Sequence, residues 1–387
     1  MVTTIIKTIK PATGGDYTTL NSWEAARTGN LVTRNANYPS AGGDPSGTIE
    51  IAEVYGGGNA LNAPLQIFWE TDATHYAEIR AAAGHEHTGV YNESKAYGKV
   101  TSGGYCLNLL QMNAKINKMQ FYGDSLTSYV IQLDGEYTPA VGLISVDRCI
   151  IKAVNMTKAV AYSARPVTLT NSLIMISGSS ATTVAAISGG SSTFKIYNNT
   201  IVVANTNAAA GDSRAIDNST GSTIQNNYIH SNSAQGDTFS HAYVTATGGS
   251  NDATSNNRAL TANLRFIPYS TATFQNVTPG SENFRLVVSA SNKLIDGGAN
   301  LTSVGVTADI IGTARPLFGA FDIGAFENDI PLCWNYTAQY RGSNKLFKAS
   351  GCGAFPKSLQ VPGNVDTSTG KMVDDGIFIS PDKYKIV

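Results

Sequence analysis

The chain has 387 residues, of which 42% are hydrophobic, enough to fill a large core. Charged residues make up only 14%, against about 25% in typical soluble domains, and the formal net charge is −1. This composition argues against a nucleic-acid surface or a membrane span. Because strong helix formers are scarce while Gly, Ser, Thr and Asn abound, we expect an all-β fold rich in turns.

The first 11 residues carry two lysines among short apolar pairs and no signal-peptide core, so we expect a soluble chain without an export signal. Next, Leu20, Trp23 and Arg27 recur at helical spacing, with Thr18 or Thr19 as the N-cap. Because the end of an open β-solenoid needs a cover, we interpret this segment as a cap helix. Trp23 is expected to belong to the core, not to a ligand site.

A short element, Asn or Asp followed two positions later by an apolar residue, recurs along the middle of the chain. Its copies begin at Asn117, Asp147, Asn171, Asn199 and Asn227, offset by 30, 24, 28 and 28 residues. Such self-similarity predicts a solenoid whose coils each hold three short strands and three turns. Asn tolerates left-handed backbone geometry, and stacked amides can hydrogen-bond along the axis, so we expect these five residues to be structural and to occupy one fixed place in the coil.

The four cysteines are too few for a disulfide scaffold. Cys106 and Cys149 sit in apolar, strand-like runs and are expected to behave as small hydrophobic residues. Cys333 and Cys352 could pair, although assembly inside a cell would keep them reduced.

Several segments near the two ends are similar to pectin-lyase-like right-handed β-helix proteins of phage and environmental bacterial type. The similar segments are Gly14 to Ala26, Ile49 to Tyr55, Thr71 to Gly89, Leu294 to Ala299, Asp309 to Pro316 and Phe321 to Glu327. The resemblance implies a single-stranded right-handed parallel β-helix over residues 1–329. It implies little about activity, because this superfamily includes lyases, hydrolases and inert spikes. Asp296 and Asp322 lie in the closing motifs and are expected to be turn and cap residues.

The composition changes after Glu327, with more Lys and Pro. Residues 330–387 are expected to form a small β-rich module for attachment or oligomerisation. Its candidate contact residues are Tyr336, Tyr340, Arg341, Phe347, Phe355, Phe378 and Tyr384.

Two groups of charged residues are weak catalytic candidates. One group is Asp212, Arg214 and Asp217, and the other is Asp134 and Glu136 with Asp147 and Arg148 one coil later. Glycoside hydrolysis needs two carboxyl groups, and a lyase needs a basic residue near an acidic calcium site. Each group is explained more simply as a solvated turn.

The histidines of the N-terminal third are a third candidate. His75, His85 and His87, with Glu86, could reach a metal only from a loop or from one face of a strand. We expect neither a metal nor another cofactor there.

These observations favour a non-enzymatic protein on the surface of a tailed-phage virion. It would decorate the capsid as a head fibre, or form a spike-like rod, anchored through its C-terminal module. A homotrimer, contacts with other virion proteins and contact with host surface glycans follow from the analogy with phage β-helices. The alternatives are a tailspike-type polysaccharide lyase or glycoside hydrolase, and a glycan-binding adhesin without turnover.

Overall fold

The computed structural model describes these residues: 2–27, 31, 47–110, 113–133, 142–162, 166–189, 194–208, 211–217, 222–236, 240–244, 251–255, 265–289, 291–317, 320–329, 333–339, 346–352, 359–360 and 378–379. Within them the regular structure is β-strand, apart from one α-helix, α1 (Leu20–Arg27), and one short 3-10 helix, η2 (Thr302–Val304). No described helix is long and apolar enough to cross a membrane.

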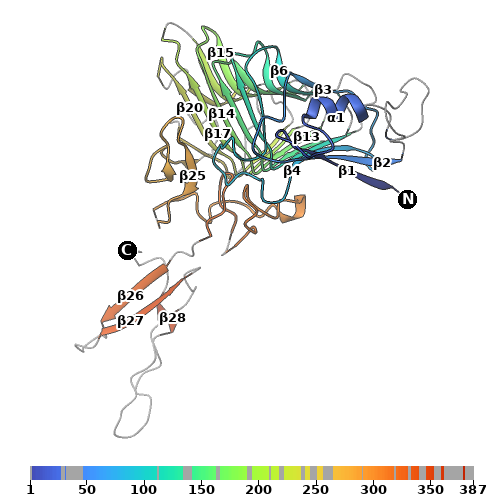
Figure 1. Cartoon of the computed structure of the whole chain (residues 1–387). Coiled ribbons are helices and arrows are strands. Elements are labelled where there is room, and N and C mark those ends of the chain that lie inside the picture. Colours follow the sequence, from blue (N-terminus) through green and yellow to red (C-terminus); the bar gives the residue numbers. More distant parts are fainter. Residues whose placement is uncertain are drawn as a thin grey trace.

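The strands stack into three parallel sheets (Figure 1). Sheet 1 contains β1 (Thr3–Ile9), β2 (Thr48–Val54), β4 (Ala77–Ala81), β7 (Ala114–Asn117), β10 (Ile144–Asp147), β13 (Val167–Thr170), β16 (Phe194–Tyr197) and β19 (Thr223–Gln225). Sheet 2 contains β5 (Tyr97–Val100), β8 (Gln120–Asp124), β11 (Ile150–Val154), β14 (Leu173–Gly178), β17 (Thr200–Asn205), β20 (Tyr228–Ser233), β22 (Ala253–Thr254) and β23 (Arg265–Phe266). Sheet 3 contains β3 (Leu65–Ile67), β6 (Tyr105–Leu109), β9 (Tyr129–Leu133), β12 (Lys158–Tyr162), β15 (Thr183–Gly189), β18 (Asp212–Asp217) and β21 (Ser240–Val244).

From β7 to β21 the chain visits sheets 1, 2 and 3 in turn, so every three strands make one coil. Alternation within each strand decides which side chains fill the coil. In β16, Phe194 and Ile196 are fully buried while Lys195 between them is exposed. This confirms the predicted right-handed parallel β-helix. Stacked apolar side chains fill its interior.

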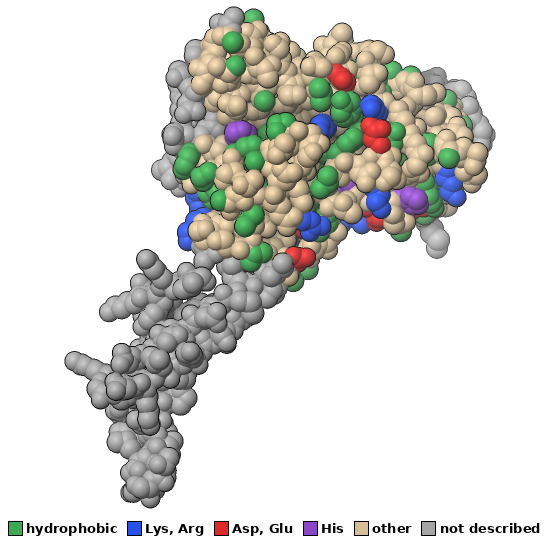
Figure 2. Space-filling view, turned by 60° about the vertical axis from the view of Figure 1, so that its left-hand side comes forward, with side chains coloured by type: hydrophobic (Ala, Val, Ile, Leu, Met, Phe, Trp, Pro, Cys, Tyr) green, Lys and Arg blue, Asp and Glu red, His purple; other side chains and the backbone are tan. Residues whose placement is uncertain are grey.

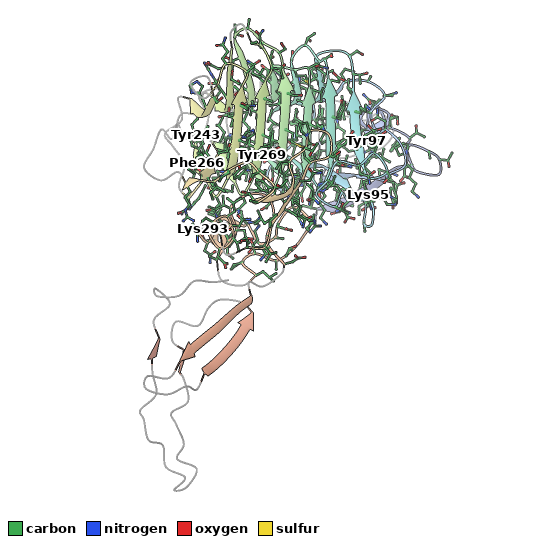
Figure 3. The ribbon with its side chains drawn as sticks, turned by 90° about the vertical axis from the view of Figure 1, so that its left-hand side faces the viewer. Lys95, Tyr97, Tyr243, Phe266, Tyr269 and Lys293 are labelled. Carbon is green, nitrogen blue, oxygen red and sulfur yellow. The ribbon has the colours of Figure 1, made fainter. Side chains whose placement is uncertain are left out.

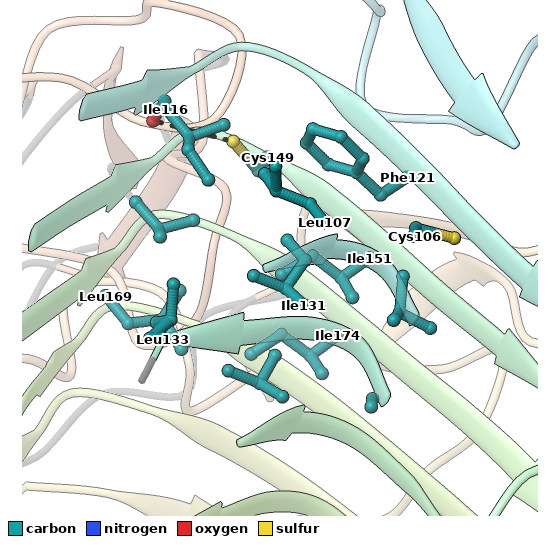
Figure 4. Packing of buried hydrophobic residues seen from close by; sticks show 14 of the residues in the cluster. Cys106, Leu107, Ile116, Phe121, Ile131, Leu133, Cys149, Ile151, Leu169 and Ile174 are labelled. Atoms are coloured by element: carbon teal, nitrogen blue, oxygen red, sulfur yellow. Dashed lines mark hydrogen bonds between the residues drawn. The ribbon is translucent and has the colours of Figure 1, made fainter. Parts of the chain in front are cut away.

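Cys106 and Cys149 belong to this interior, as predicted (Figure 4). Both are fully buried, and burial raises the pKa of each thiol to about 12. They behave as small apolar residues and not as nucleophiles.

The recurring asparagines do not share one register. Asn117 and Asp147 are the last residues of their strands. Asn117 pairs with Asp147, and Asp147 pairs with Thr170 of the next coil. Asn171 lies one position further along the turn, and Asn199 and Asn227 lie two positions further. The prediction that these residues occupy one fixed place in the coil was therefore wrong. The sequence motif begins at the strand end in some coils and one or two positions later in others.

The left-handed position of this turn is its middle residue. It is occupied in successive coils by Lys118, Arg148, Asn171, Asn198 and Asn226, with φ between 49° and 60°. The position after it forms a buried ladder along the axis. The amide nitrogen Nδ2 of Asn199 donates to Oδ1 of Asn227 over 3.0 Å, and Nδ2 of Asn227 donates to Asp252 over 3.1 Å. Amide stacking along the axis is thus confirmed for Asn199 and Asn227.

Helix α1 covers the N-terminal end of the stack. Leu20, Trp23 and Arg27 are its buried residues, as their spacing predicted. Thr19 is the N-cap, since its hydroxyl accepts from the backbone N–H of Ser22 over 3.1 Å. The ring of Trp23 lies 4.9 Å from that of Trp69, so Trp23 is a core residue.

Residues 265–328, called the closing segment below, pack on the outside of sheet 2 and form a second core there. This core joins residues of the sheet, such as Leu173 and Tyr228, to Phe274, Phe284 and Phe326. The segment contains the hairpin β24 (Phe274–Asn276) and β25 (Asn283–Leu286). Figure 3 labels Tyr269 of this segment, whose ring stacks on that of His230 in β20 at 3.9 Å.

The described C-terminal strands add to none of the three sheets (Figure 1). β26 (Cys333–Gln339) pairs with β27 (Leu346–Cys352), and β28 (Leu359–Gln360) pairs with β29 (Phe378–Ile379), both antiparallel. Tyr336, Phe347 and Phe378 lie in these strands, whereas Tyr340, Arg341, Phe355 and Tyr384 lie outside the described residues. The division of the chain at residue 330 stays a prediction.

Candidate functional site: a polar cleft on sheet 1

A cleft of about 350 Å³ lies between the outer face of sheet 1 and residues 304–308, which connect the first two closing motifs. Its lining residues come from three neighbouring coils and from the wall opposite: Leu143, Ser145, Asp147, Arg148, Thr168, Thr170, Asn171, Lys195, Val304, Gly305, Val306, Thr307 and Ala308. On the face shown in Figure 2, the charged side chains are scattered among uncharged ones.

Strand register explains why these side chains meet. Ser145, Thr168 and Lys195 are direct partners across β10, β13 and β16, so they form one outward row. Asp147 and Thr170 are partners in the next outward row. Because residues two apart on a strand face the same side, the two rows form a polar floor.

Asp147 and Arg148 form the charged pair of the cleft. The Nε of Arg148 lies 2.7 Å from Oδ2 of Asp147. The other carboxylate oxygen accepts from the Thr170 hydroxyl over 2.7 Å and from Nδ2 of Asn171 over 2.9 Å. In the described structure the terminal nitrogens of Arg148 have no side-chain partner, so its planar fork can take a second anion.

The backbone that presents Arg148 is held from the N-terminal third of the chain. The Nε2 of buried His87 lies 2.8 Å from the carbonyl oxygen of Arg148, while its Nδ1 accepts from the N–H of Gly89 over 3.2 Å. Because Nδ1 accepts, Nε2 carries the proton and donates it. Burial lowers the pKa of His87 to about 4, so the ring stays neutral at physiological pH. His87 fixes the left-handed turn at Arg148.

Lys195 supplies the second positive charge. Its side chain is exposed, and among the described residues it makes no ion pair, hydrogen bond or ring contact. By contrast, Lys115, in the same outward row three coils earlier, lies 3.8 Å over the ring of Tyr76. The lining thus carries two cations and one anion, and Lys195 has no counter-charge.

Asn171 also lines the cleft. Its side chain is 3% exposed, yet Oδ1 has no hydrogen-bond partner. Asn117, which precedes Asp147 by one coil, also has a buried Oδ1 without a partner. Buried polar atoms are normally paired, so two unpaired amide oxygens at this turn are unusual in the described structure.

The other catalytic candidates do not join this cleft. Arg214 lies between its two predicted carboxylates on sheet 3, 2.7 Å from Asp212 and 3.2 Å from Asp217, as a surface ion network. Asp134 and Glu136 lie outside the described residues.

The three histidines are held apart by different partners. His75 lies 3.0 Å from Asp72, His85 accepts from the N–H of Gly56 over 3.1 Å, and His87 contacts Arg148. In the described part of the chain no group of three or more His, Cys, Asp or Glu side chains could hold a metal ion.

Asp296 and Asp322 are turn and cap residues, as expected. The N–H of Asp296 donates to Asp322 Oδ1 over 2.7 Å, and Oδ1 of Asp296 accepts from the N–H of Ala320 over 3.0 Å.

Sequence reasoning named Asp147, Arg148 and Asn171 but missed Lys195 and the wall of the cleft. The alternation around Lys195 marked it as outward-facing, which was a usable signal. The wall, residues 304–308, could not be foreseen because its contact with sheet 1 spans more than 100 positions of sequence.

The molecule is thus a parallel β-helix with a polar cleft of positive net charge on one sheet. No model of a known protein family matches the chain, and no curated protein matches it. Among solved structures, the crystal structure of pectate lyase Pel9A matches with a TM-score of 0.33 and 12% identity, over 85% of this chain and 97% of that one. Values this low say nothing about the activity of this protein.

Proposed function

We propose that the protein is a non-enzymatic rod that binds an acidic polysaccharide through the cleft on sheet 1. The observation that carries the proposal is the open fork of Arg148 beside the unpaired ammonium of Lys195. A guanidinium fork matches a carboxylate in plane and spacing, so a sugar carboxylate fits it. The hydroxyls of Ser145, Thr168 and Thr307 suit the hydroxyls of a sugar ring.

The geometry of the floor favours a polymer. Adjacent strands lie about 4.8 Å apart, a spacing comparable with the length of one sugar residue in an extended chain. A glycan lying along the rod would therefore place successive sugars over β10, β13 and β16.

Binding without turnover fits the cleft better than lyase or hydrolase chemistry. Hydrolysis uses two carboxyl groups about 5 to 9.5 Å apart. Among the described lining residues Asp147 is the one carboxylate, and its oxygens already accept from Arg148, Thr170 and Asn171. Incubation with an acidic polysaccharide should leave its length unchanged. New reducing ends, or absorbance from an unsaturated uronate, would establish the enzymatic alternative instead.

The binding test compares an acidic with a neutral oligosaccharide by calorimetry. A galacturonate hexamer should bind, and a neutral glucose hexamer should not. Lys195→Ala should weaken binding about 10-fold, equal to about 1.4 kcal/mol, and the affinity should fall with salt. Lys158→Ala is the control, because Lys158 lies on sheet 3, 5.5 Å over the ring of Tyr129. Equal binding of both hexamers, or no effect of Lys195→Ala, would contradict the proposal.

We further propose that the rod is carried on the surface of a tailed-phage virion, anchored by residues 330–387 and assembled as a homotrimer. The strand pairs β26–β27 and β28–β29, which join none of the coil sheets, support a separate attachment role. Deleting residues 330–387 should abolish incorporation into particles and leave the β-rich circular dichroism intact. Normal incorporation of the truncated chain would refute the anchoring role.

A further inference from the structure

One end of the hairpin formed by β26 and β27 consists of two cysteines. The strands are antiparallel and pair over seven positions, from Cys333 with Cys352 to Gln339 with Leu346. Figure 1 shows the two strands side by side. Because the chain connects them after Gln339, Cys333 and Cys352 lie at the open end of the hairpin.

Direct partners in an antiparallel pair have the separation that a disulfide needs. Their Cα atoms lie about 4.5 or 5.5 Å apart, depending on whether the pair is hydrogen-bonded. The Cα atoms of two cysteines joined by a disulfide lie about 4.4 to 6.8 Å apart. Both kinds of pair fall within that range, and direct partners also share one face of the hairpin. The register therefore allows a bridge between Cys333 and Cys352 without a shift of the backbone.

The face that carries the cysteines is the polar face of the hairpin. Since residues alternate along a strand, the register places both cysteines on one face with Asn335, Thr337, Lys348 and Ser350. Trp334, Tyr336 and Phe347 belong to the other face. We therefore expect a small water-soluble oxidant to reach the cysteine pair.

The other two cysteines of the chain are placed differently. Cys106 and Cys149 are fully buried among the apolar side chains that fill the coils. A soluble oxidant cannot reach them in the folded protein, so they should remain thiols.

The hairpin gains more from a covalent bond than a coil strand would. Among the described strands, none pairs with β26 or β27 except these two with each other. An isolated two-stranded hairpin is marginally stable in water, and its open end frays first. A bond between Cys333 and Cys352 would hold the strands together at that end.

We propose that Cys333 and Cys352 form an intrachain disulfide when the protein meets an oxidising solution, and that this bond stabilises the hairpin. In a reducing cell interior the pair stays unbridged. The inference goes beyond the proposed function and does not depend on glycan binding.

The oxidant is a small-molecule disulfide such as oxidised glutathione. One cysteine thiolate attacks it, forms a mixed disulfide and releases one reduced glutathione. The second thiolate attacks the cysteine sulfur of the mixed disulfide and releases the other glutathione. The two thiol protons end on the two released glutathione molecules, so two protein thiols are oxidised and one glutathione disulfide is reduced.

The first test treats the full-length protein with oxidised glutathione and counts the remaining thiols. After glutathione is removed, the protein is unfolded in an alkylating reagent and its mass is measured. Two of the four cysteines should be alkylated. A non-reduced digest should contain one peptide pair that joins Cys333 to Cys352. Alkylation of all four, or a bond between two chains, would overturn the proposal.

The second test moves one cysteine to examine the register. The double variant Cys352→Ser/Gly351→Cys places a thiol opposite Trp334, on the other face from Cys333. It should form a disulfide with Cys333 at least about 10-fold more slowly than the unaltered pair does, because the two positions no longer share a face. Equal rates would show that the register does not bring the cysteines together.

The third test measures the effect on the hairpin by hydrogen exchange. The amides of β26 and β27 should exchange at least about 10-fold more slowly after oxidation, because the bond removes open conformations. Cys333→Ser is the control and should exchange at one rate under both conditions. Unchanged exchange in the oxidised protein, or slower exchange in oxidised Cys333→Ser, would refute the stabilising role of the disulfide.

Discussion

At the scale of single residues, three successive positions around the turn after each sheet-1 strand have different structural roles, which the sequence motif did not distinguish. The strand-end residue faces the cleft, as Asp147 does. The next residue takes the left-handed conformation, and the one after it enters the buried ladder, as Asn199 and Asn227 do. Asparagine suits both the left-handed position and the buried ladder, for different reasons. The presence of an asparagine in the sequence therefore could not show which of the two positions it occupies. The sequence therefore predicted structural asparagines but not their register.

Asp252 continues this ladder after Asn227, and its carboxyl is fully buried. Burial raises its pKa from 3.8 to about 7. Because the folded pKa exceeds the unfolded one, the folded state holds more protons between these values. The stabilising contribution is complete below about pH 4 and is lost as the pH rises through 7.

Asp252→Asn should therefore leave stability near pH 4 unchanged and raise it at pH 8, by on the order of 2 kcal/mol. An amide can keep the contacts with Asn227 and with the Tyr243 hydroxyl, which lies 2.6 Å from Oδ2. Urea unfolding at both pH values measures the difference. Asp322, whose pKa is also raised to about 7, is unchanged in both proteins, so its contribution cancels in the comparison. A variant less stable than the parent at pH 8 would contradict the prediction.

At the scale of elements, the cap helix was predictable because its information is local. A Thr N-cap and buried residues at helical spacing sufficed to place α1, and its sequence shows the apolar side that must face the coil. The partners of its buried residues were not predictable. Arg27 forms a buried ion pair with Glu50, and Trp23 packs on Trp69, both from segments far along the chain.

Trp23→Ala should destabilise the protein by about 3 to 5 kcal/mol, because it removes the largest side chain between the helix and the first coil. The loss is measured by urea unfolding followed by circular dichroism. Glu24→Gln on the same helix is the control, since an amide oxygen can still accept from Trp69 Nε1, now 3.2 Å from Oε1 of Glu24. A loss below 1 kcal/mol would show that the helix does not close the stack.

At the scale of the whole molecule, the stacked rod could be predicted and its outer layer could not. Periodic strands and Gly- and Ser-rich corners reveal a solenoid because each coil must bury its apolar face against its neighbours in the same way. The closing segment packs on sheet 2 and borders the cleft through contacts with no period, such as Asn226 with Ala299. The floor of the candidate site was therefore within reach of sequence reasoning, while the wall depended on the folded chain.

Arg315 ties the closing segment together and should be sensitive to substitution. Its guanidinium is fully buried, 3.2 Å from Glu327, and donates to the carbonyls of Asp322 and Gly324. Arg315→Met leaves Glu327 buried without a counter-charge and should cost about 3 to 5 kcal/mol near neutral pH. Burial already raises the pKa of Glu327, so the deficit should shrink at pH 4, where the acid is neutral.

The matched control is Arg214→Met. Arg214 is 26% exposed beside Asp212, and loss of such a surface pair costs about 0 to 1 kcal/mol. Equal losses for the two arginine variants in urea unfolding would refute the role of Arg315.

Because the chain visits the three sheets in a fixed order, the length of the rod is set by the number of its coils. Each coil advances the chain by one strand spacing, so the number of coils before β10 sets how far the cleft stands from the end closed by α1. Duplicating one coil ahead of His87 would carry the cleft outward by a single step and leave its floor, its wall and the contact of His87 with Arg148 intact. Reach and recognition can therefore change separately during evolution, one by the count of coils and the other by a few side chains.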